Sequence, residues 1–226
     1  MQLEKVTTKR QNEEKRRYDD ACGLAHAMEL LGERWAMLVL RELAYGPRRF
    51  SELKNDLQGI SANVLTQRLT ELEARGLVRK LKLPPPASVQ VYEATSWGLE
   101  VIPVIASLGR WAARSPWHDP TLPMSHVSVI MSLQTLISTE RAEGIDARIC
   151  FRLGEATYVA TVRDGRLDVD RRDSDDCDVT FTGAPSAVAG VIHGGAPFET
   201  IQIAGNMDLA RRFVTLFPLP SKVETR

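Results

Sequence analysis

Three prolines within nine residues separate two parts of this chain that have different sequence patterns. The stretch 115–123, SPWHDPTLP, contains Pro116, Pro120 and Pro123. Proline fixes its own φ angle and disfavours the helical conformation in the residue before it, so neither a helix nor a central strand is expected to run through this stretch. Apolar residues recur mainly at helical spacing before it, whereas alternating, strand-like segments follow it. We therefore expect a linker at 115–123 between two folded domains.

Composition argues against a membrane protein and against a disulfide scaffold. No run approaches the roughly 20 apolar residues that span a bilayer, and the charged N-terminus lacks the apolar core of a signal peptide. We therefore expect a cytoplasmic protein with no membrane partner. Cys22, Cys150 and Cys177 are too few and too scattered for a disulfide framework, and no Cys or His pair has the spacing of zinc ligands. The net charge is zero, but residues up to Trp117 carry an excess of about four positive charges, which favours nucleic-acid binding by the first half.

The residues before the linker predict a winged helix-turn-helix at 19–114, preceded by a flexible or helical arm at 1–18. The expected elements are, in order, helices at 19–31, 33–44, 51–57 and 61–75, strands at 77–83 and 88–94, and a helix at 95–114 that bends at Pro103. Ser51 and Ser61 are the expected N-caps of the two central helices, and Gly76 suits the left-handed residue after the second. Pro84, Pro85 and Pro86 separate the two strands, which is typical of a stiff wing rather than a tight turn.

The helix at 61–75 has the pattern of a recognition helix. Leu65, Leu69 and Leu72 form one apolar stripe, and the opposite face carries neutral side chains that can hydrogen-bond to base edges in the major groove. An ordinary surface helix shows the same pattern, so the motif, the wing and the basic flanks are needed together to favour DNA binding. Arginine and lysine at the flanks would meet phosphates. The candidate DNA-binding residues are Arg48, Arg49, Ser61, Asn63, Thr66, Gln67, Arg68, Thr70, Lys80 and Lys82.

Specific motifs in this half point to a known family. They are Gly-Glu-Arg-Trp at 32–35, Gly-Pro-Arg-Arg-Phe at 46–50, and Ile-Ser followed by Leu-Thr-Gln-Arg-Leu. Through them, residues 22–111 closely resemble the HxlR family of winged helix-turn-helix regulators, which are relatives of MarR. The resemblance implies a bacterial transcription regulator that forms a homodimer and binds double-stranded DNA at an inverted-repeat operator. The wing, with its compact tip of prolines, departs from the family pattern.

The resemblance also implies which helices form the dimer contact and which cysteine is a candidate sensor. The first and last helices of the domain usually form the contact, although the same side chains also fit an intramolecular core. The corresponding residues are Leu24, Met28, Val101, Val104, Ile105, Leu108 and Trp111. Cys22 matches the position at which some family members sense electrophiles or oxidants. It lies near a helix N-terminus, where the helix dipole lowers a thiol pKa, although Asp19 and Asp20 oppose a thiolate and a lone helical Cys is more often a buried apolar residue.

The residues after the linker, 124–226, predict an α+β domain. A helix at about 124–142 precedes the alternating segment DARICFRL, and Asp164-Gly165 predicts a hairpin between the next two strands. The runs DARICFRLGEATYVATVRDGRLDV, DCDVTFTGAPSAVAGVIHGG and IQIAGNMDLARRFVTLF resemble the sterol-carrier-protein-like fold. The resemblance implies a mostly antiparallel sheet that encloses, with its helices, an apolar tunnel for a hydrophobic ligand. Candidate pocket residues, equally explicable as core, are Phe151, Tyr158, Phe181, Val188, Ile192, Phe198, Ile203 and Phe213.

No motif in the chain predicts catalysis, a metal site or a cofactor. The sequence contains no nucleophile elbow, phosphate-binding loop, Rossmann glycine run or metalloprotease helix, and its histidines are isolated. The acidic run at 173–178 lacks the glycine and the terminal glutamate of a calcium loop. We therefore expect an α+β, two-domain, homodimeric transcription regulator controlled by a hydrophobic small molecule. The alternative is a lipid carrier with a vestigial DNA-binding domain, which the intact polar face of helix 61–75 opposes; an enzyme acting on a hydrophobic substrate ranks third.

Overall fold

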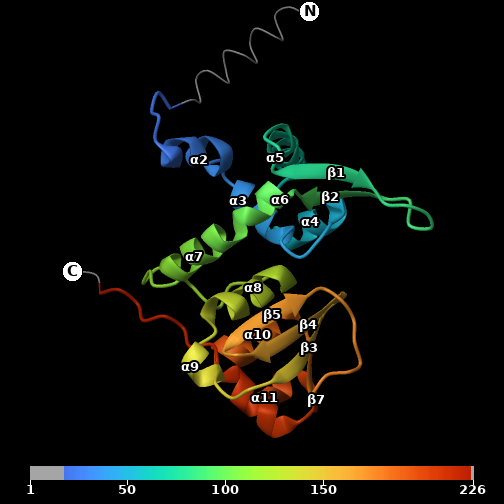
Figure 1. Ribbon diagram of the computed structural model, residues 1–226, viewed down its shortest axis with the longest axis vertical. Coiled ribbons are helices and arrows are strands. Elements are labelled where there is room, and N and C mark those ends of the chain that lie inside the picture. The colour runs from blue at the N-terminus through green and yellow to red at the C-terminus, as the bar shows by residue number, and fades with distance from the viewer. Residues whose placement is uncertain (1–17, 225–226) are drawn as a thin grey trace, which may run out of the picture.

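The computed structural model describes residues 18–224 and contains two separate hydrophobic cores (Figure 1). The predicted arm at 1–18 lies outside the described residues apart from Tyr18. One core is built from residues between 36 and 94, and the other from residues between 129 and 217. The stretch 115–123 contains no helix or strand. Among the described residues, no helix is long and apolar enough to cross a membrane.

The N-terminal domain has the predicted order of elements. They are α2 (Gly23–Leu31), α3 (Ala36–Glu42), α4 (Phe50–Asp56), α5 (Ala62–Ala74), β1 (Val78–Lys82), β2 (Gln90–Ala94), α6 (Ser96–Glu100) and α7 (Ile102–Ala112). Strands β1 and β2 pair antiparallel and project as a wing beside α5 (Figure 1). Leu65, Leu69 and Leu72 of α5 are fully buried, as their helical spacing predicts.

Helix capping explains where α5 begins and corrects the predicted start of α4. Ser61 caps α5, since its hydroxyl accepts a hydrogen bond from the Val64 N–H at 3.2 Å. Ser51 is not a cap. Helix α4 begins one residue earlier, and the N–H of its N-cap Arg49 donates to the Glu52 carboxylate at 2.9 Å. The carboxylate three residues into the helix replaces the hydroxyl cap that the sequence predicted.

The helix predicted at 95–114 is divided into α6 and α7 by a break at Val101. Thr95 caps α6 by accepting a hydrogen bond from the Gly98 N–H at 3.0 Å. Pro103 then lies in the first turn of α7. A proline is tolerated there because the N–H groups of a first turn have no partner within the helix. In place of the bend expected at Pro103, the chain breaks at Val101 and a new helix starts at Ile102.

The C-terminal domain combines a five-stranded sheet with helices. Its elements are α8 (His126–Leu136), α9 (Thr139–Ala142), β3 (Ala147–Leu153), β4 (Ala156–Arg163), β5 (Arg166–Asp170), β6 (Val179–Gly183), α10 (Pro185–His193), η1 (Phe198–Thr200), β7 (Gln202–Gly205) and α11 (Met207–Val214). The strand order is β5-β4-β3-β6-β7, and β3–β6 is its only parallel pair. The mostly antiparallel sheet is thus confirmed. The helix predicted at 124–142 is two helices, because Ser138 starts a new one by capping α9.

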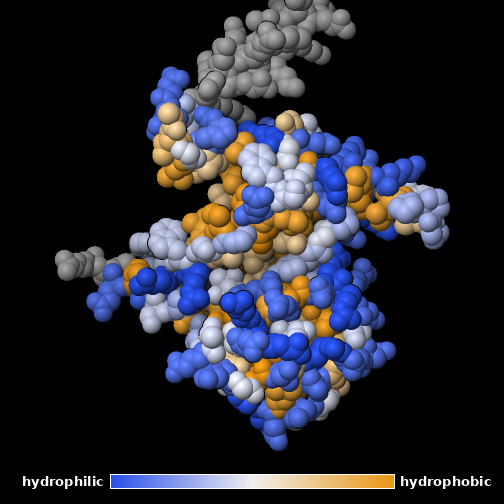
Figure 2. Space-filling model, viewed as in Figure 1, coloured by the Kyte–Doolittle hydropathy of each residue, from blue (hydrophilic) through white to orange (hydrophobic). Residues whose placement is uncertain are grey.

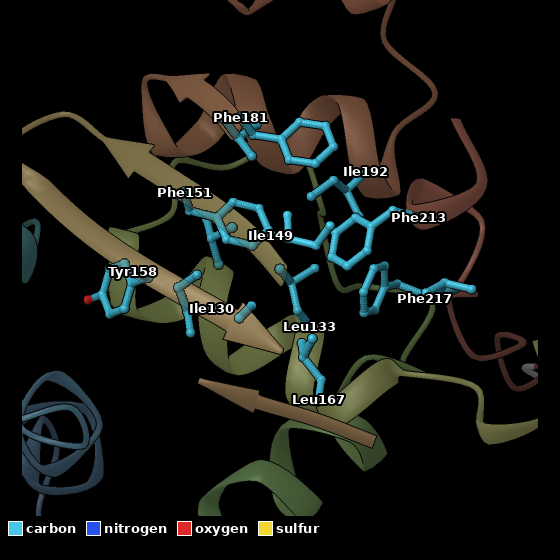
Figure 3. Packing of buried hydrophobic residues seen from close by; sticks show 14 of the residues in the cluster. Ile130, Leu133, Ile149, Phe151, Tyr158, Leu167, Phe181, Ile192, Phe213 and Phe217 are labelled. Carbon is cyan, nitrogen blue, oxygen red and sulfur yellow. The ribbon is translucent and has the colours of Figure 1, made fainter. Parts of the chain in front are cut away.

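Seven of the eight side chains predicted to line a pocket lie in or against the core of this domain (Figure 3). The Phe151 and Phe181 rings stack with centroids 5.6 Å apart, and Phe213 lies 5.7 Å from Phe181. Phe217 packs on Phe213 at 4.9 Å. Of the eight predicted residues, Phe151, Tyr158, Phe181, Val188, Ile192 and Phe213 are buried, and Phe198 and Ile203 are partly buried. Aromatic rings that pack on one another therefore form much of this core.

Candidate DNA-binding surface and domain contact

The polar face of α5 is exposed as predicted. Asn63, Thr66, Gln67 and Thr70 all lie on the surface, opposite the buried leucines. The Thr66 and Thr70 hydroxyls donate to the carbonyls four residues earlier, both at 2.9 Å, and the Gln67 amide donates to Glu71 at 3.0 Å. These bonds are local and at the surface, so the amide and hydroxyl groups can exchange them for hydrogen bonds to base edges.

Exposed cations lie on both sides of this helix. Arg49 precedes α4, and Lys80 and Lys82 lie on the first strand of the wing. All three side chains are exposed, which suits contacts with phosphates. The neighbouring Arg79 is held by Glu93 across the hairpin, at 2.6 Å.

Two predicted DNA contacts, Arg48 and Arg68, are wrong. The Arg68 side chain is buried and pairs with Glu33 at 3.2 Å and Glu71 at 2.7 Å. Arg48 is only 3% exposed and pairs with carboxylates of its own domain. A guanidinium group removed from water is stable only when it is paired, and local acids form ion pairs with both arginines. The sequence signal of a basic flank did not distinguish a surface cation from a buried one.

Arg48 is the centre of a buried ionic cluster at the contact between the two domains. Its guanidinium pairs with Glu52 at 3.0 Å, with Asp56, and with Glu42 at 4.0 Å. From the other domain, His126 Nε2 lies 3.3 Å from Asp56, and its Nδ1 lies 2.6 Å from the Tyr158 hydroxyl. With Nε2–H donating to Asp56, Nδ1 accepts from Tyr158. We call these six residues, Glu42, Arg48, Glu52, Asp56, His126 and Tyr158, the Arg48 cluster.

Other polar contacts across the same boundary support the cluster. The Ser125 hydroxyl at the start of α8 donates to Glu42 at 2.8 Å, and the Tyr45 hydroxyl donates to Gln134. The Arg110 guanidinium of α7 donates to the Thr135 carbonyl at 2.9 Å. Figure 3 shows Tyr158 at the edge of the C-terminal core with its hydroxyl directed out of it. The N-terminal domain is therefore attached to the C-terminal one through α3, α4 and α7.

The ionisation of the cluster is set by burial and by its partners. Burial by itself raises the pKa of Asp56, but hydrogen bonds from His126 and Arg48 outweigh it and hold that pKa below its ordinary value. The pKa of Glu52 is lowered in the same way, against its burial, by the Arg49 N–H and by Arg48. Burial raises the pKa of the Tyr158 hydroxyl well above its ordinary range. The carboxylates are therefore charged and Tyr158 is a neutral hydrogen-bond donor near pH 7.

Cys22 is exposed and precedes the first residue of α2 as its N-cap. The N–H groups of Leu24 and Ala25 point at its sulfur and lower the pKa of the thiol. Asp20 does not cap the helix; its carboxylate accepts from the Cys22 N–H at 2.9 Å. Cys22 thus has the exposure and the electrostatic environment of a reactive thiol.

The helices expected to form a dimer contact carry exposed apolar side chains. Leu24 and Trp111 are each 70% exposed, and Met28, Val104 and Leu108 are also exposed. Val101 and Ile105 instead pack against the core of their own domain, which corrects their assignment to the interface. Figure 2 shows apolar surface on α2 and between α2 and α7.

The structure pairs two cysteines that the sequence did not bring together. Cys150 and Cys177 form a disulfide, although 27 residues separate them. The fold brings Cys177, two residues before β6, beside Cys150 in the middle of β3, which no local sequence pattern reveals. Among residues 18–224, no group of His, Cys, Asp and Glu side chains is arranged to hold a metal ion.

Comparison with known proteins agrees with the arrangement of the two domains. Residues 30–119 match the HxlR-like helix-turn-helix family, and residues 130–218 match the SCP-2 sterol transfer family. The chain is 34% identical over 95 residues to the uncharacterized HTH-type transcriptional regulator YvaP of Bacillus subtilis, covering 42% of this chain and 86% of YvaP. The chain belongs to the HxlR-like helix-turn-helix family.

A second relative and two solved structures are similar over the same region. YkvN, another uncharacterized HTH-type regulator of B. subtilis, is 40% identical over 92 residues, covering 40% of this chain and 77% of YkvN. The reduced form of the B. subtilis regulator YodB is 31% identical, covers 44% of this chain and 100% of its own, and gives a TM-score of 0.39. A putative MarR-family regulator of Porphyromonas gingivalis is 26% identical over 42% of this chain and 93% of its own, with a TM-score of 0.39.

This HxlR-like protein is therefore a transcriptional regulator with a helix-turn-helix DNA-binding domain, joined to an SCP-2-like domain. The two matched regions contain every member of the Arg48 cluster except His126, which lies between them at the start of α8.

Acid should destabilise the protein through Asp56. The stability that this carboxylate contributes is fully present above its unfolded pKa of about 4 and is lost as the pH falls through its lower folded pKa. We expect Asp56→Asn to lower the free energy of unfolding by about 2–4 kcal/mol at pH 7, because it leaves Arg48 buried with one partner fewer. The variant should then lose less further stability than the wild type between pH 5 and pH 2.

Urea unfolding at a series of pH values measures both effects. Asp168→Asn is the matched control, since Asp168 is exposed on β5. Equal acid sensitivity of the wild type and Asp56→Asn would contradict the role assigned to the cluster.

Proposed function

We propose that this HxlR-like regulator binds an inverted-repeat operator as a homodimer, with α5 in the major groove and the wing beside it. The observation that carries the proposal is the exposed polar face of α5, fixed by three buried leucines and flanked by exposed cations. A two-fold dimer places two such helices on successive turns of the duplex. The groups proposed to contact DNA are Arg49, Ser61, Asn63, Thr66, Gln67, Thr70, Lys80 and Lys82.

The exposed apolar side chains of α2 and α7 support the dimer. Trp111, Leu108 and Val104 lie on one helix, and Leu24 and Met28 on the other, and all five are exposed. Exposed apolar patches of this kind mark interaction sites, and a two-fold contact buries the same patch on both copies. The SCP-2-like domain packs on a different side of the N-terminal domain, against α3, α4 and α7. Dimerisation through α2 and the exposed face of α7 leaves the Arg48 cluster undisturbed.

We also propose that a hydrophobic small molecule bound by the SCP-2-like domain changes DNA affinity. Support comes from the family match and from the Arg48 cluster, in which Tyr158 belongs to the C-terminal core and Asp56 to the helix before α5. Because aromatic side chains fill the core, a ligand must displace them, and Tyr158 adjoins the affected volume. Movement of Tyr158 would displace His126, which is hydrogen-bonded to its hydroxyl, and His126 would in turn displace Asp56 of α4. Cys22 is proposed as an oxidant-sensitive thiol that acts separately, at α2.

Base selection and phosphate binding should respond to different substitutions. Selection from a random DNA pool should enrich an inverted repeat with half-sites about 10 base pairs apart. Gln67→Ala should then lower affinity for the preferred base by about 1–3 kcal/mol and relax its choice, whereas Lys82→Ala should weaken all sequences alike and reduce the salt slope by about one. Arg166→Ala, which removes an exposed cation on β5 of the other domain, is the control. Failure to enrich any sequence would favour the carrier with a vestigial DNA-binding domain.

Dimerisation should be abolished by charge on α7. We expect Leu108→Glu and Trp111→Glu to elute with the 25.2 kDa mass of one chain, and the wild type with about twice that mass. Operator affinity should fall by about 100-fold or more, since two linked half-sites bind with avidity. Leu122→Glu, an exposed residue in the segment 115–123, is the matched control. Multi-angle light scattering gives the masses, and a monomeric wild type would refute the proposed assembly.

Oleate serves as a probe for ligand control. Saturating oleate should change the operator dissociation constant by about 5- to 150-fold in the wild type. Tyr158→Phe keeps the ring but removes the hydroxyl that reaches His126, so it should bind oleate with unchanged affinity and lose most of the change in DNA affinity. Fluorescence titration measures oleate binding, and anisotropy of a labelled operator measures DNA binding. An operator dissociation constant that does not change when oleate binds would exclude the coupling.

A further inference from the structure

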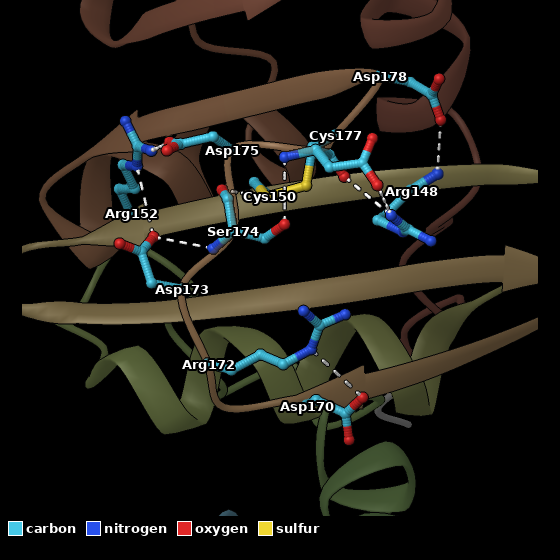
Figure 4. The surroundings of a disulfide bond; sticks show 11 residues. Arg148, Cys150, Arg152, Asp170, Arg172, Asp173, Ser174, Asp175, Cys177 and Asp178 are labelled. Atoms are coloured by element: carbon cyan, nitrogen blue, oxygen red, sulfur yellow. Dashed lines mark hydrogen bonds and ion pairs between the residues drawn. A yellow bond between two sulfur atoms is a disulfide. The ribbon is translucent and has the colours of Figure 1, made fainter.

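Cys150 and Cys177 are placed so that their disulfide can form and break with little change in the sheet. Cys150 lies in the middle of β3 and is 2% exposed, whereas Cys177 is partly exposed in the segment between β5 and β6 (Figure 4). Their Cα atoms are 5.8 Å apart, within the range of about 4.4–6.8 Å that suits a disulfide. Strand β3 holds Cys150 in place, and the hydrogen bond from the Asp178 N–H to the Arg148 carbonyl holds the neighbour of Cys177 beside β3. The two thiols of the reduced protein therefore remain neighbours.

Because the protein is a transcriptional regulator, its cellular environment limits the roles that this disulfide can have. A transcriptional regulator works beside DNA, where cellular thiols keep cysteines reduced. Disulfides in that environment are usually transient and serve catalysis or redox sensing, rather than permanent stabilisation. We propose that Cys150 and Cys177 form a reversible redox site, separate from Cys22, that fixes the segment 171–178 when it is oxidised by a low-molecular-weight disulfide.

The exchange reaction follows from the difference in exposure. The Cys177 thiol loses its proton and the thiolate attacks one sulfur of the small disulfide, forming a mixed disulfide and releasing one thiolate. The Cys150 thiol then loses its proton and attacks Cys177 sulfur, which forms the internal disulfide and releases the second small thiolate. Two protein thiols are oxidised, and one small disulfide is reduced to two thiols that take up the two protons. Reduction by a dithiol reverses both steps.

Without the disulfide, exposed ion pairs and one hydrogen bond from the Arg148 guanidinium to the Asp176 carbonyl, at 3.2 Å, hold most of this segment. Arg152 pairs with Asp175, and Arg148 with Asp176, but these aspartate side chains are 96% and 90% exposed. Surface pairs of this kind contribute little. The firm anchor comes at the end of the segment, where the Asp178 N–H donates to the Arg148 carbonyl at 2.8 Å and the Arg148 N–H donates to Asp178 at 2.7 Å. The disulfide is therefore what holds residues 171–176 against β3.

Trypsin tests whether the disulfide fixes the segment 171–178, because trypsin cleaves after Arg171 and Arg172. The experiment uses the full chain carrying Cys22→Ser, incubated with reduced or with oxidised glutathione. Oxidised protein should yield a Cys150–Cys177 cross-linked peptide by mass spectrometry, and its cleavage at Arg171 and Arg172 should be about tenfold slower than in the reduced protein. Adding Cys150→Ser and Cys177→Ser should remove the difference, with cleavage at the reduced rate. Absence of the cross-linked peptide, or equal cleavage in both states, would overturn the proposal.

Discussion

The buried guanidinium of Arg48 is the interaction on which the arrangement of this protein depends. A cation at 3% exposure is tolerated only with compensating charge, and Glu42, Glu52 and Asp56 supply it from α3 and α4. Asp56 then accepts from His126 of the SCP-2-like domain. The cluster therefore fixes α4 within its own domain and fixes that domain against the other. Removal of one member leaves a buried charge without its partner, which makes the contact all-or-none rather than graded.

Each surface of the HxlR-like domain has a different proposed role. The polar face of α5 and the wing are exposed for the proposed DNA contact, the apolar side chains of α2 and α7 are exposed for the proposed contact with a second copy, and α3, α4 and the start of α8 enclose the charged cluster. Helix α7 also contacts the SCP-2-like domain, since Arg110 donates to the Thr135 carbonyl. In the proposed coupling, a signal from the SCP-2-like domain reaches α5 through α4, because α4 and α5 share the buried leucines of one core.

The SCP-2-like domain has the fold of a hydrophobic-ligand binder but a core filled by its own aromatic rings. Phe151, Phe181, Phe213 and Phe217 stack or pack edge to face with centroid distances between 4.9 and 6.0 Å. In such a core, ligand binding and rearrangement of side chains are the same event, which is suited to sensing rather than storage. The disulfide lies on β3 at Cys150, a position that alternates with the core-facing Ile149 and Phe151. The opposite faces of one strand therefore carry the two proposed signals.

Local sequence patterns were enough to predict most secondary-structure elements and to recognise both families. The leucine stripe of α5, the cap at Ser61, the Asp164-Gly165 hairpin and the alternation along β3 follow from periods and turn chemistry within a few residues, and the family motifs are equally local. In contrast, which charged side chains are buried depends on tertiary contacts. Arg48 and Arg49 are adjacent in sequence, yet one is enclosed by three acids and the other faces water, because α4 packs against α8 at that point.

Pairings between distant residues were likewise invisible in the sequence. Cys150 meets Cys177 although β4 and β5 lie between them in the sequence, and His126 meets Asp56 across a domain boundary. Apolar alternation likewise shows that a side chain faces inward, but not whether neighbouring rings leave space for a ligand between them. Periodicity specifies the direction of a side chain, whereas partners and packing are set by the whole fold.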